Sequence, residues 1–364
     1  MKKLRSEFPG KLETKPKLVL IDGNAIIHRA YHALPKTMTN RKGQMTNAIY
    51  GFTTTLIKVL EDLRPQYIAT SFDLAGPTFR HEQYKEYKAT RVKADQELYD
   101  QIPKIKELVE LMDIPIYEEQ GFEADDCIGT IVEKIRNTNI EIRNKSKSEN
   151  CSVQNWEIEI YIVSGDKDIY QLVDSKVKVY SLRRGLSQMQ VVDHQTIEKE
   201  YNLQPADFID LKALAGDASD NIPGVPGIGP KTATELIQKF DSLEKLYKFL
   251  EANSYQLTAI SLIKPRIVDL LKKYKEQAFL SQKLATIHRD VPIKFSLEEC
   301  KWGEYDRNKL QEFFEELGFN SLLKRFGVTS EKSEIPASPA GRQANVEINS
   351  KPEIKRNDEQ LKLL

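Results

Sequence analysis

The chain has 364 residues, of which 40% are hydrophobic and 30% charged, so it can form two compact domains with sizeable cores. Lysine plus arginine and aspartate plus glutamate number 54 each, which excludes a uniformly basic coat for nucleic acid and leaves local charge clusters as the electrostatic signal. The three cysteines have neither disulfide nor zinc spacing, and the sequence shows no signal peptide and no membrane-spanning run. We therefore expect a soluble, cytoplasmic protein without a membrane partner.

Strands and helices alternate over the first 200 residues. Apolar runs rich in β-branched residues predict strands at 17–21, 67–72, 115–117 and 158–163. Helical spacing predicts helices at 46–63, at 98–112 and from Glu123 to about Arg136. This alternation predicts an α/β fold whose mainly parallel sheet is flanked by helices. The segment 137–156, which is rich in Asn, Ser and Lys, is predicted to be an inserted surface loop.

Beyond about residue 200 the pattern is helical as far as residue 328, interrupted by NIPGVPGIGP at 221–230. We expect a smaller, all-helical domain there. The last segment has no aromatic residue after position 330 and mixes Ser, Pro, Asn and charges, which is typical of a disordered tail or linker. The predicted organisation is a flexible N-terminus at 1–15, an α/β domain at 16–200, a helical domain at 201–328 and a tail at 329–364.

Acidic residues fall after predicted strands, at the start of one helix and in one polar turn: Asp22, Asp73, Glu123, Asp125, Asp126, Asp166, Asp168, Asp217 and Asp220. The carboxyl ends of parallel strands share one edge of a sheet, so these acids could converge. Converging carboxylates raise one another's pKa values unless cations compensate, and hard oxygen ligands suit Mg²⁺ or Mn²⁺. Two such ions can activate a water and stabilise the leaving oxygen of a phosphodiester. The pattern therefore favours metal-dependent phosphodiester hydrolysis.

Turn and capping roles are the alternative for each acid taken singly. An Asp after a strand is often an N-cap, and acids at a helix start favour its dipole. Three acids within the four positions of EADD exceed what capping requires, and the clusters together favour the metal site. His28 and His32 are predicted to be structural, and Cys127 to be a small buried apolar residue.

The segment NIPGVPGIGPKTATELI has the form of a helix-hairpin-helix. Gly224, Gly227 and Gly229 permit tight turns and close backbone approach. Lys231 and Thr232 begin a helix whose unpaired N–H groups can hold a phosphate. Such a module would grip the DNA backbone without reading sequence, and an ordinary interhelical turn is the alternative.

The segment 79–93, FRHEQYKEYKATRVK, is basic and carries interleaved tyrosines. Cations plus aromatic rings suit single-stranded nucleic acid, whereas a solvated helix face is the equal alternative. Arg29, shortly after Asp22, could reach a phosphate or form a surface salt bridge. Within the segment 79–93, the candidates for contact with nucleic acid are Arg80, Lys85, Tyr87, Lys88 and Arg91.

In this order, the segments LVLIDGNAIIHRAYHAL, SFDLAGPTFRHEQYKEYKATR, GFEADDCIGT, SGDKDIYQLV and GDASDNIPGVPGIGPKTA resemble the 5′→3′ exonuclease domain of bacterial DNA polymerase I, a part of the flap endonuclease family. The resemblance covers about residues 16–328. It implies a PIN-like nuclease core, a helical arch at about 79–112 over the active site and a C-terminal helical domain. It also implies that all nine acids bind metal, with Asp73, Glu123 and Asp125 nearer one ion and Asp166, Asp168 and Asp220 nearer the other.

By the same resemblance, Tyr87, Lys88 and Arg91 steer the scissile phosphate and Arg29 contacts a phosphate. The turn Gly224–Lys231 binds duplex DNA and holds a K⁺ ion through backbone carbonyls. Two features depart from the family pattern: the arch continues as VKADQELYD where the family has a Pro-rich stretch, and the insertion at 137–156 is long. No polymerase sequence follows, so we expect a stand-alone nuclease, the product of a split gene or a fragment ending in a linker.

The function expected from the sequence is a structure-specific 5′→3′ exonuclease and flap endonuclease that uses two Mg²⁺ or Mn²⁺ ions in DNA replication and repair. Its substrates would be 5′ flaps, nicked or gapped duplexes and RNA primers on DNA. We expect a nucleoid-associated monomer that works with a polymerase domain or a separate polymerase. A non-catalytic DNA clamp and a PIN-type ribonuclease acting on single-stranded RNA are the rival hypotheses.

Overall fold

The computed structural model describes residues 15–148, 158–184, 188–252 and 263–325. Residues 1–14 and the tail predicted at 329–364 therefore lie outside the described residues. No helix in the described part of the chain is long and apolar enough to span a membrane.

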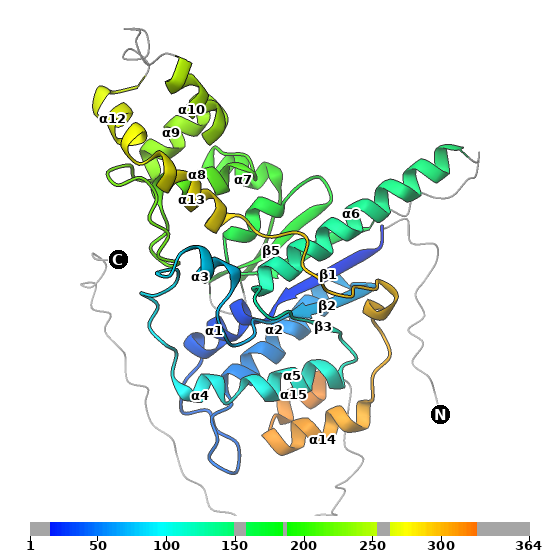
Figure 1. The fold of residues 1–364 in the computed structure, drawn as a ribbon. Coiled ribbons are helices and arrows are strands. Elements are labelled where there is room, and N and C mark those ends of the chain that lie inside the picture. Colours follow the sequence, from blue (N-terminus) through cyan, green and yellow to red (C-terminus); the bar gives the residue numbers. More distant parts are fainter. Residues whose placement is uncertain (1–14, 149–157, 185–187, 253–262, 326–364) are drawn as a thin grey trace, which may run out of the picture. The chain divides into compact units, whose positions relative to one another are not determined.

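A six-stranded sheet with the order β3-β2-β1-β4-β5-β6 lies at the centre of the fold (Figure 1). Its first five strands in space run parallel and β6 pairs antiparallel with β5, so the predicted mainly parallel sheet is confirmed. The sequence patterns had not predicted the last two strands. The strands are β1 Lys17–Asp22, β2 Tyr67–Ser71, β3 Ile116–Tyr117, β4 Glu159–Ser164, β5 Val177–Arg184 and β6 Gln188–Val192.

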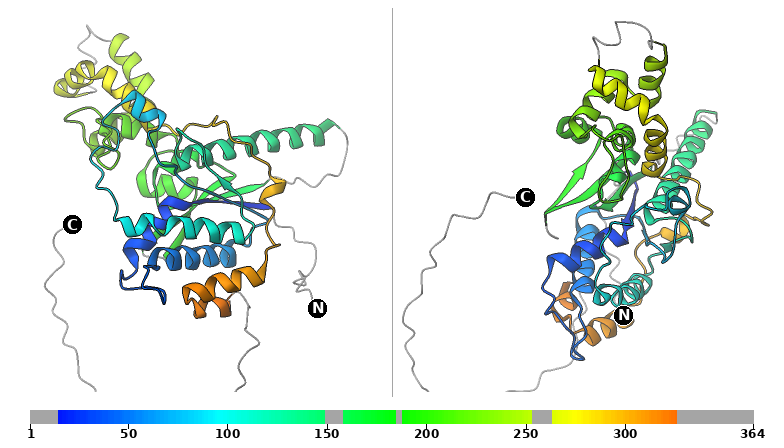
Figure 2. Two further views of the ribbon diagram at one scale, coloured as in Figure 1. Left: turned by 60° about the horizontal axis from the view of Figure 1, so that its bottom comes forward. Right: turned by 60° about the vertical axis from the view of Figure 1, so that its left-hand side comes forward.

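Alternate residues of the central strands are buried on opposite faces of the sheet. Leu18 and Leu20 of β1 belong to one hydrophobic cluster, and Val19 and Ile21 belong to another. Strands covered on both faces read as continuous apolar runs, which is why LVLI was recognisable in the sequence. Helix α6 (Ala124–Ser148) covers the first face, whereas α1 (Gly23–Ala33), α2 (Asn47–Leu63) and α5 (Ile102–Leu111) cover the second (Figure 2).

Two predicted elements differ from the structure. The helix expected at 98–112 begins only at Ile102, after the short helix α4 (Gln96–Tyr99), because Pro103 in its first turn cannot continue a helix from upstream. The surface loop expected from residue 137 is helical as far as Ser148, since α6 continues through a stretch without Gly or Pro. Residues 149–157 of that loop lie outside the described residues.

The arch segment is helical only in part, whereas the resemblance implies a helical arch at about 79–112. It contains the five-residue helix α3 (Phe79–Gln83), followed by turns and extended backbone up to Asp95. Lys88 has a left-handed φ of 55°, and its N–H donates to the backbone oxygen of Asp220 at 2.9 Å. A left-handed residue interrupts a right-handed helix, so this segment folds against the turn at 217–220.

The helical part of the chain comprises α7 His194–Tyr201, α8 Asp207–Ala215, α9 Pro230–Phe240, α10 Leu243–Ala252, α12 Pro265–Lys273 and α13 Lys275–Ala285. The last two helices, α14 (Arg307–Leu317) and α15 (Asn320–Arg325), pack on the α2 and α5 side of the sheet (Figure 1). Residues at the C-terminal end of the expected helical domain thus contribute to the core of the α/β part. Two short 3₁₀ helices, η1 Asp168–Leu172 and η2 Glu298–Cys300, complete the described elements.

Candidate active site

The C-terminal ends of β1, β2 and β4 bring most of the predicted acids around one small cavity with a volume of about 140 Å³. The basic side chains of Lys88 and Arg91 and the amide of Asn24 also line it. Asp217 instead lines an adjoining hollow of about 950 Å³, and Asp126 lines neither. The acids around the cavity are Asp22, Asp73, Glu123, Asp125, Asp166, Asp168 and Asp220.

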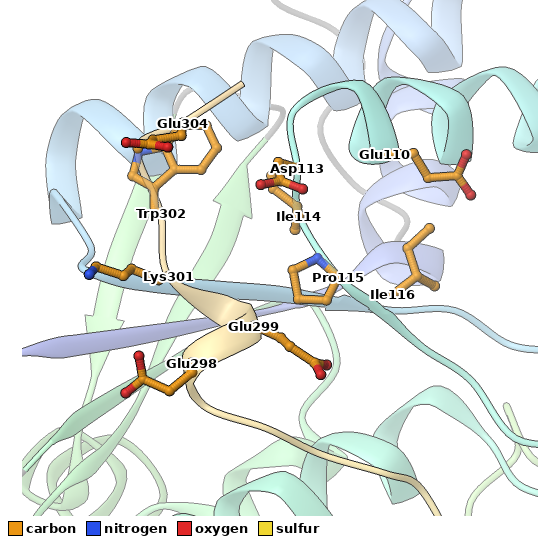
Figure 3. A pocket seen from close by; sticks show the side chains of 11 residues that line it. Glu110, Asp113, Ile114, Pro115, Ile116, Glu298, Glu299, Lys301, Trp302 and Glu304 are labelled. Atoms are coloured by element: carbon orange, nitrogen blue, oxygen red, sulfur yellow. The ribbon is translucent and has the colours of Figure 1, made fainter. Parts of the chain in front are cut away.

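A second hollow, of about 1060 Å³, lies at the β3 edge of the sheet and contains none of these acids (Figure 3). Its walls come from the end of α5 and from the segment around η2, including Asp113, Glu299 and Trp302. The converging strand ends, not this wider hollow, carry the chemistry that the sequence indicates.

Asp22 ends β1 and is also the N-cap of α1. Its Oδ1 accepts from the N–H of Ala25 at 3.0 Å, and its Oδ2 accepts from the hydroxyl of Ser164 at 2.7 Å. Burial raises the pKa of Asp22 to about 7, with help from the nearby carboxylates Asp73 and Asp166 and against the two hydrogen bonds. The capping alternative is therefore true of Asp22, but a cap alone needs no further carboxylates beside it.

Asp73 joins the end of β2 to two helices. Its Oδ1 accepts from the N–H of Ala124 at 2.7 Å, in the first turn of α6, and its Oδ2 accepts from Asn24 at 2.8 Å. Asp73, two residues after the end of β2, thus links the first turn of α1 to the first turn of α6 and holds the acidic start of α6 beside the strand ends.

Asp125 is the clearest sign of a cation site. Its Oδ1 is buried and has no hydrogen-bond partner. Burial raises the pKa of Asp125 well above its ordinary value, and Asp126 and Glu123 add to this rise, while Arg80 and Lys88 oppose it. An unpaired buried carboxylate oxygen is costly unless a cation coordinates it. The hard oxygen donors around this cavity therefore fit Mg²⁺ or Mn²⁺.

In the described residues, no group of three or more His, Cys, Asp or Glu side chains is already arranged to hold a metal ion, so the acids of the cavity fit a cation by their chemistry and burial and not by a preformed ligand shell. The chain's own cations are paired with several of the carboxylates instead. Lys88 Nζ lies 2.7 Å from Oε1 of Glu123, and Arg91 pairs with Asp220. The site is thus partly neutralised by basic side chains that reach in from the arch segment.

Lys212 was not recognised from the sequence. It lies in the last turn of α8 and pairs with both Asp168 and Asp217. Burial lowers the pKa of Lys212, but the two carboxylates outweigh it and raise the pKa above its ordinary value. Burial and Asp166 raise the pKa of Asp168 to about 7, although Lys212 opposes the rise. The only signal for Lys212 in the sequence was its position five residues before Asp217, and a lysine at that position is equally typical of an exposed helix face.

Tyr87 belongs to the arch segment and is only 2% exposed. Its hydroxyl is 3.1 Å from Oε2 of Glu123 and 3.0 Å from Oδ2 of Asp220, so one proton is shared between two acids of the cavity. Arg91 adds a bond from Nε to the backbone oxygen of Ser219 at 3.1 Å. The expected steering residues therefore do come together at the cavity, whereas Lys85 is exposed outside it.

Arg29 lies in α1 and lines the adjoining hollow of about 950 Å³ together with His28, His32 and Lys212. Its guanidinium covers Gly165, since a Cβ at that position would lie 3.4 Å from Nη2 of Arg29. Two histidines expected to be structural thus face the hollow beside the acids. Burial lowers the pKa of His28, and His32 and Arg91 lower it further.

Arg80 and Asp126 are placed differently from the expectation. Arg80 is 2% exposed and Asp126 is fully buried, and their side chains form two hydrogen bonds of 2.7 and 2.8 Å. Arg80 is therefore buried where an exposed DNA contact was expected.

The expected hairpin is the turn 216–229 between α8 and α9. Gly224 has a φ of 59°, and a Cβ there would lie 2.2 Å from the backbone nitrogen of Gly216, so this glycine is required by close backbone packing. Gly227, Gly229 and Lys231 are exposed, and Lys231 and Thr232 lie in the first turn of α9, where backbone N–H groups have no intrahelical acceptor.

Two family models match the chain. Residues 17–202 match the 5′-3′ exonuclease, N-terminal resolvase-like domain, and residues 203–308 match the 5′-3′ exonuclease, C-terminal SAM fold. DNA polymerase I of Bacillus subtilis (strain 168) is 38% identical over 320 residues, covering 88% of this chain and 33% of the relative. DNA polymerase I of Streptococcus pneumoniae (strain ATCC BAA-255 / R6) is 38% identical over 319 residues, covering 87% and 33%. The chain thus spans about a third of the length of these relatives.

Solved structures share the fold at lower sequence identity. The T5 5′-exonuclease with bound zinc ions has a TM-score of 0.56 and 20% identity, covering 74% of this chain and 89% of that one. The catalytic core of Rad2 in complex with a DNA substrate has a TM-score of 0.53 and 17% identity, covering 86% and 92%.

Proposed function

The chain belongs to the 5′-3′ exonuclease family, and from this premise we propose that it hydrolyses phosphodiester bonds near 5′ ends in DNA replication and repair. Its proposed substrates are 5′ flaps, nicked or gapped duplexes and RNA primers on DNA. The observation that carries this proposal is the small acidic cavity at the strand ends, with the unpaired Oδ1 of Asp125 beside the basic side chains of Lys88 and Arg91.

We assign two divalent cations, Mg²⁺ or Mn²⁺, to this cavity. When bound, they would neutralise the carboxylates and supply Lewis-acid activation of water and of the leaving oxygen. Asp73, Glu123 and Asp125 would hold one ion, and Asp166, Asp168 and Asp220 the other. After burial, the groups that raise the pKa of Asp125 include Glu123, and those that raise the pKa of Asp168 include Asp166 and Asp220, which supports grouping these acids. The place of Asp73 rests on the family resemblance. Asp22 and Asp217 would complete the acidic set at its margins.

The basic residues of the site would act on the phosphate. Lys88 and Arg91 now neutralise Glu123 and Asp220, and each could instead pair with a phosphate oxygen once cations hold the carboxylates. Tyr87, whose hydroxyl contacts the same two acids, would position them. Arg29, in the adjoining hollow, would contact a neighbouring phosphate.

Duplex DNA would bind at the start of α9. Gly227, Gly229 and Lys231 are exposed there, and a helix N-terminus with a free first turn favours a phosphate. Gly224 and Thr232 would shape this turn, and Lys85 would add an exposed cation on the arch segment. We also propose a K⁺ ion held by backbone carbonyls of the turn, other than that of Gly224, which accepts from Gln277 at 2.7 Å.

The proposed setting is the nucleoid, where the chain would act as a monomer beside a polymerase. The relatives that support this partner are DNA polymerase I proteins, of which the chain spans about a third. The polymerase would be either part of the same polypeptide or a separate protein.

The test is cleavage of a labelled 5′-flap duplex with and without Mg²⁺. Asp125→Ala and Asp166→Ala should each lower the rate of cleavage by more than about a hundredfold, since each removes a cavity carboxylate. Glu312→Ala, an exposed acid on α14, is the matched control and should cleave normally. Near-normal cleavage by either cavity variant would exclude the proposed metal site. Preferential cleavage of single-stranded RNA would instead favour a ribonuclease.

A further inference from the structure

Two neighbouring acids of α6 have opposite surroundings. Asp125 has an unpaired, buried Oδ1, whereas both oxygens of Asp126 are fully used. Oδ1 of Asp126 accepts from Arg80 and from the N–H of His288 at 2.7 Å, and Oδ2 accepts from Arg80 and from the N–H of Glu123 at 3.0 Å. A carboxylate has about four lone-pair sites, so Asp126 keeps none for a cation.

Arg80 is equally saturated. Nε donates to the backbone oxygen of Leu284 at 3.0 Å, and Nη2 donates to the backbone oxygen of Thr286 at 3.1 Å. Two more donors bind Asp126, and Nη1 lies 3.5 Å from Oε2 of Glu123. A guanidinium has five N–H donors in a fixed fork, and here all of them face acceptors in the interior.

These bonds join parts of the chain that are distant in sequence. Arg80 lies in α3 at the base of the arch segment, Glu123 and Asp126 lie at the start of α6, and residues 284–288 leave the end of α13. The same 284–288 segment is tied to η1, which begins at Asp168. Gln171 donates to the backbone oxygen of Ala285 at 3.0 Å and accepts from the N–H of Ile287 at 2.9 Å.

Helix α13 also reaches the turn that we propose to bind duplex DNA. The hydroxyl of Ser281 accepts from the N–H of Gly224 at 3.0 Å, and Gln277 donates to the backbone oxygen of the same glycine. Hydrogen bonds thus connect this turn to α13. The end of α13 and the residues after it, 284–288, are in turn bonded to Arg80 and Asp126 near the start of α6 and to Gln171 of η1, which begins at Asp168.

We infer that Arg80 is a positioning residue: through Asp126 and the 284–288 segment it holds the start of α6 in register with the helical part of the chain, and Asp126 serves Arg80 instead of a metal ion. This inference rests on the proposed nuclease function and deepens it. It replaces the expected roles of Arg80 as a DNA contact and of Asp126 as a metal ligand.

The test combines flap cleavage with a count of bound Mn²⁺ by electron paramagnetic resonance. Arg80→Lys keeps the charge but loses the fork, and Asp126→Asn keeps the shape but loses the charge. Each should lower kcat by roughly 10–100-fold, as is usual when a partner that orients a ligand is removed. KM for the flap should stay within about threefold, because neither buried side chain can contact the substrate. The double variant should be no slower than the slower single variant, because the two residues act as one unit.

All three variants should bind as many Mn²⁺ ions per chain as the wild type, whereas Asp125→Asn should bind fewer. Glu312→Ala, an exposed acid on α14 outside the site, is the control and should leave both kcat and KM unchanged. Loss of a bound Mn²⁺ in Asp126→Asn, or multiplying losses in the double variant, would overturn the inference. If circular dichroism shows that Arg80→Lys does not fold, Asp126→Asn alone tests the inference, by its kcat for flap cleavage and by the number of Mn²⁺ ions that it binds. An inactive wild type would refute the proposed function, whereas an active wild type with unaffected variants would refute the positioning role alone.

Discussion

Lys88 Nζ lies 2.7 Å from Oε1 of Glu123, so a cation of the arch segment neutralises a carboxylate of the acidic cavity. The Lys88 side chain is only 18% exposed, and the contact is made from a left-handed backbone position. A buried ion pair is weak evidence for stability, because removing water from both charges costs about as much as their attraction returns. The position is better explained by the reaction, in which the same cation would face a phosphate.

Lys88→Met should therefore lower the rate of flap cleavage by about 10²–10³-fold, the usual loss when one preorganised charge is removed from a transition state. The measurement is single-turnover cleavage with saturating protein and Mg²⁺. Lys85→Met, an exposed neighbour on the same segment, should change the rate little under these conditions. An unchanged rate in Lys88→Met would remove Lys88 from the catalytic residues.

Removal of one cavity carboxylate should stabilise the metal-free protein. Asp125 is buried beside Asp126 and Glu123, and these neighbours raise its pKa. Asp125→Asn relieves that repulsion, so we expect a higher free energy of unfolding in EDTA than for the wild type. Mg²⁺ should stabilise the wild type by about 2.7 kcal/mol at 100 times its Kd and the variant by clearly less. Urea unfolding with and without Mg²⁺ measures both, with Glu312→Gln as the control; equal Mg²⁺ effects would count against Asp125 as a ligand.

Stability without metal should also depend on pH through Asp22. Burial raises the pKa of Asp22 from 3.8 to about 7, so between these values the folded protein holds a proton that the unfolded chain has released. The contribution of Asp22 to the free energy of unfolding is thus greatest below its unfolded pKa and falls as the pH rises to about 7. Asp22→Asn should flatten this fall, which urea unfolding in EDTA at several pH values measures.

Asp217 provides a control of opposite sign. Burial raises the pKa of Asp217, but Lys212 and Ser219 outweigh it and hold the pKa below its ordinary value. Asp217 therefore stabilises the fold above its unfolded pKa and loses this effect as the pH falls. Asp217→Asn should reduce stability at neutral pH and leave it nearly unchanged in acid. For Asp22, the contradicting outcome is a free energy of unfolding that depends more steeply on pH in Asp22→Asn than in the wild type, since the Asp22 carboxyl would then not be buried.

The family and the mainly parallel α/β fold were predictable because the signals are local. Each central strand is an apolar run ending in Asp or Ser, and parallel topology then brings the strand ends to one edge. Strands β5 and β6 were missed since VKVYSLRR and QMQVV mix charged and polar residues with apolar ones. The roles of Lys212, Arg80 and Asp126 depend on partners more than forty positions away, such as Asp168 for Lys212 and Asp126 for Arg80, and a single sequence cannot supply these pairings.

The turn between α8 and α9 offers two glycines with different roles. A Cβ at Gly224 would lie 2.2 Å from the nitrogen of Gly216, and its φ of 59° is unfavourable for other residues, whereas a Cβ at Gly229 would meet nothing within 4 Å. Gly224→Ala should therefore cost at least about 1–3 kcal/mol of stability, and Gly229→Ala clearly less, because it only replaces a favoured N-cap residue of α9. Thermal unfolding of the two variants measures this difference, and equal midpoints would show that the turn relaxes.

Lys231 allows the proposed duplex-binding surface to be tested apart from the acidic cavity. It is exposed in the first turn of α9, and Lys239, in the last turn of the same helix, is a matched lysine at the other end. If Lys231 contacts a phosphate, Lys231→Ala should weaken duplex binding about equally for all sequences and reduce the slope of log K against log salt by about one. Lys239→Ala should leave the slope unchanged. Binding titrations at several salt concentrations in Ca²⁺ or EDTA separate this effect from cleavage, and an unchanged slope in Lys231→Ala would place the duplex elsewhere on the protein.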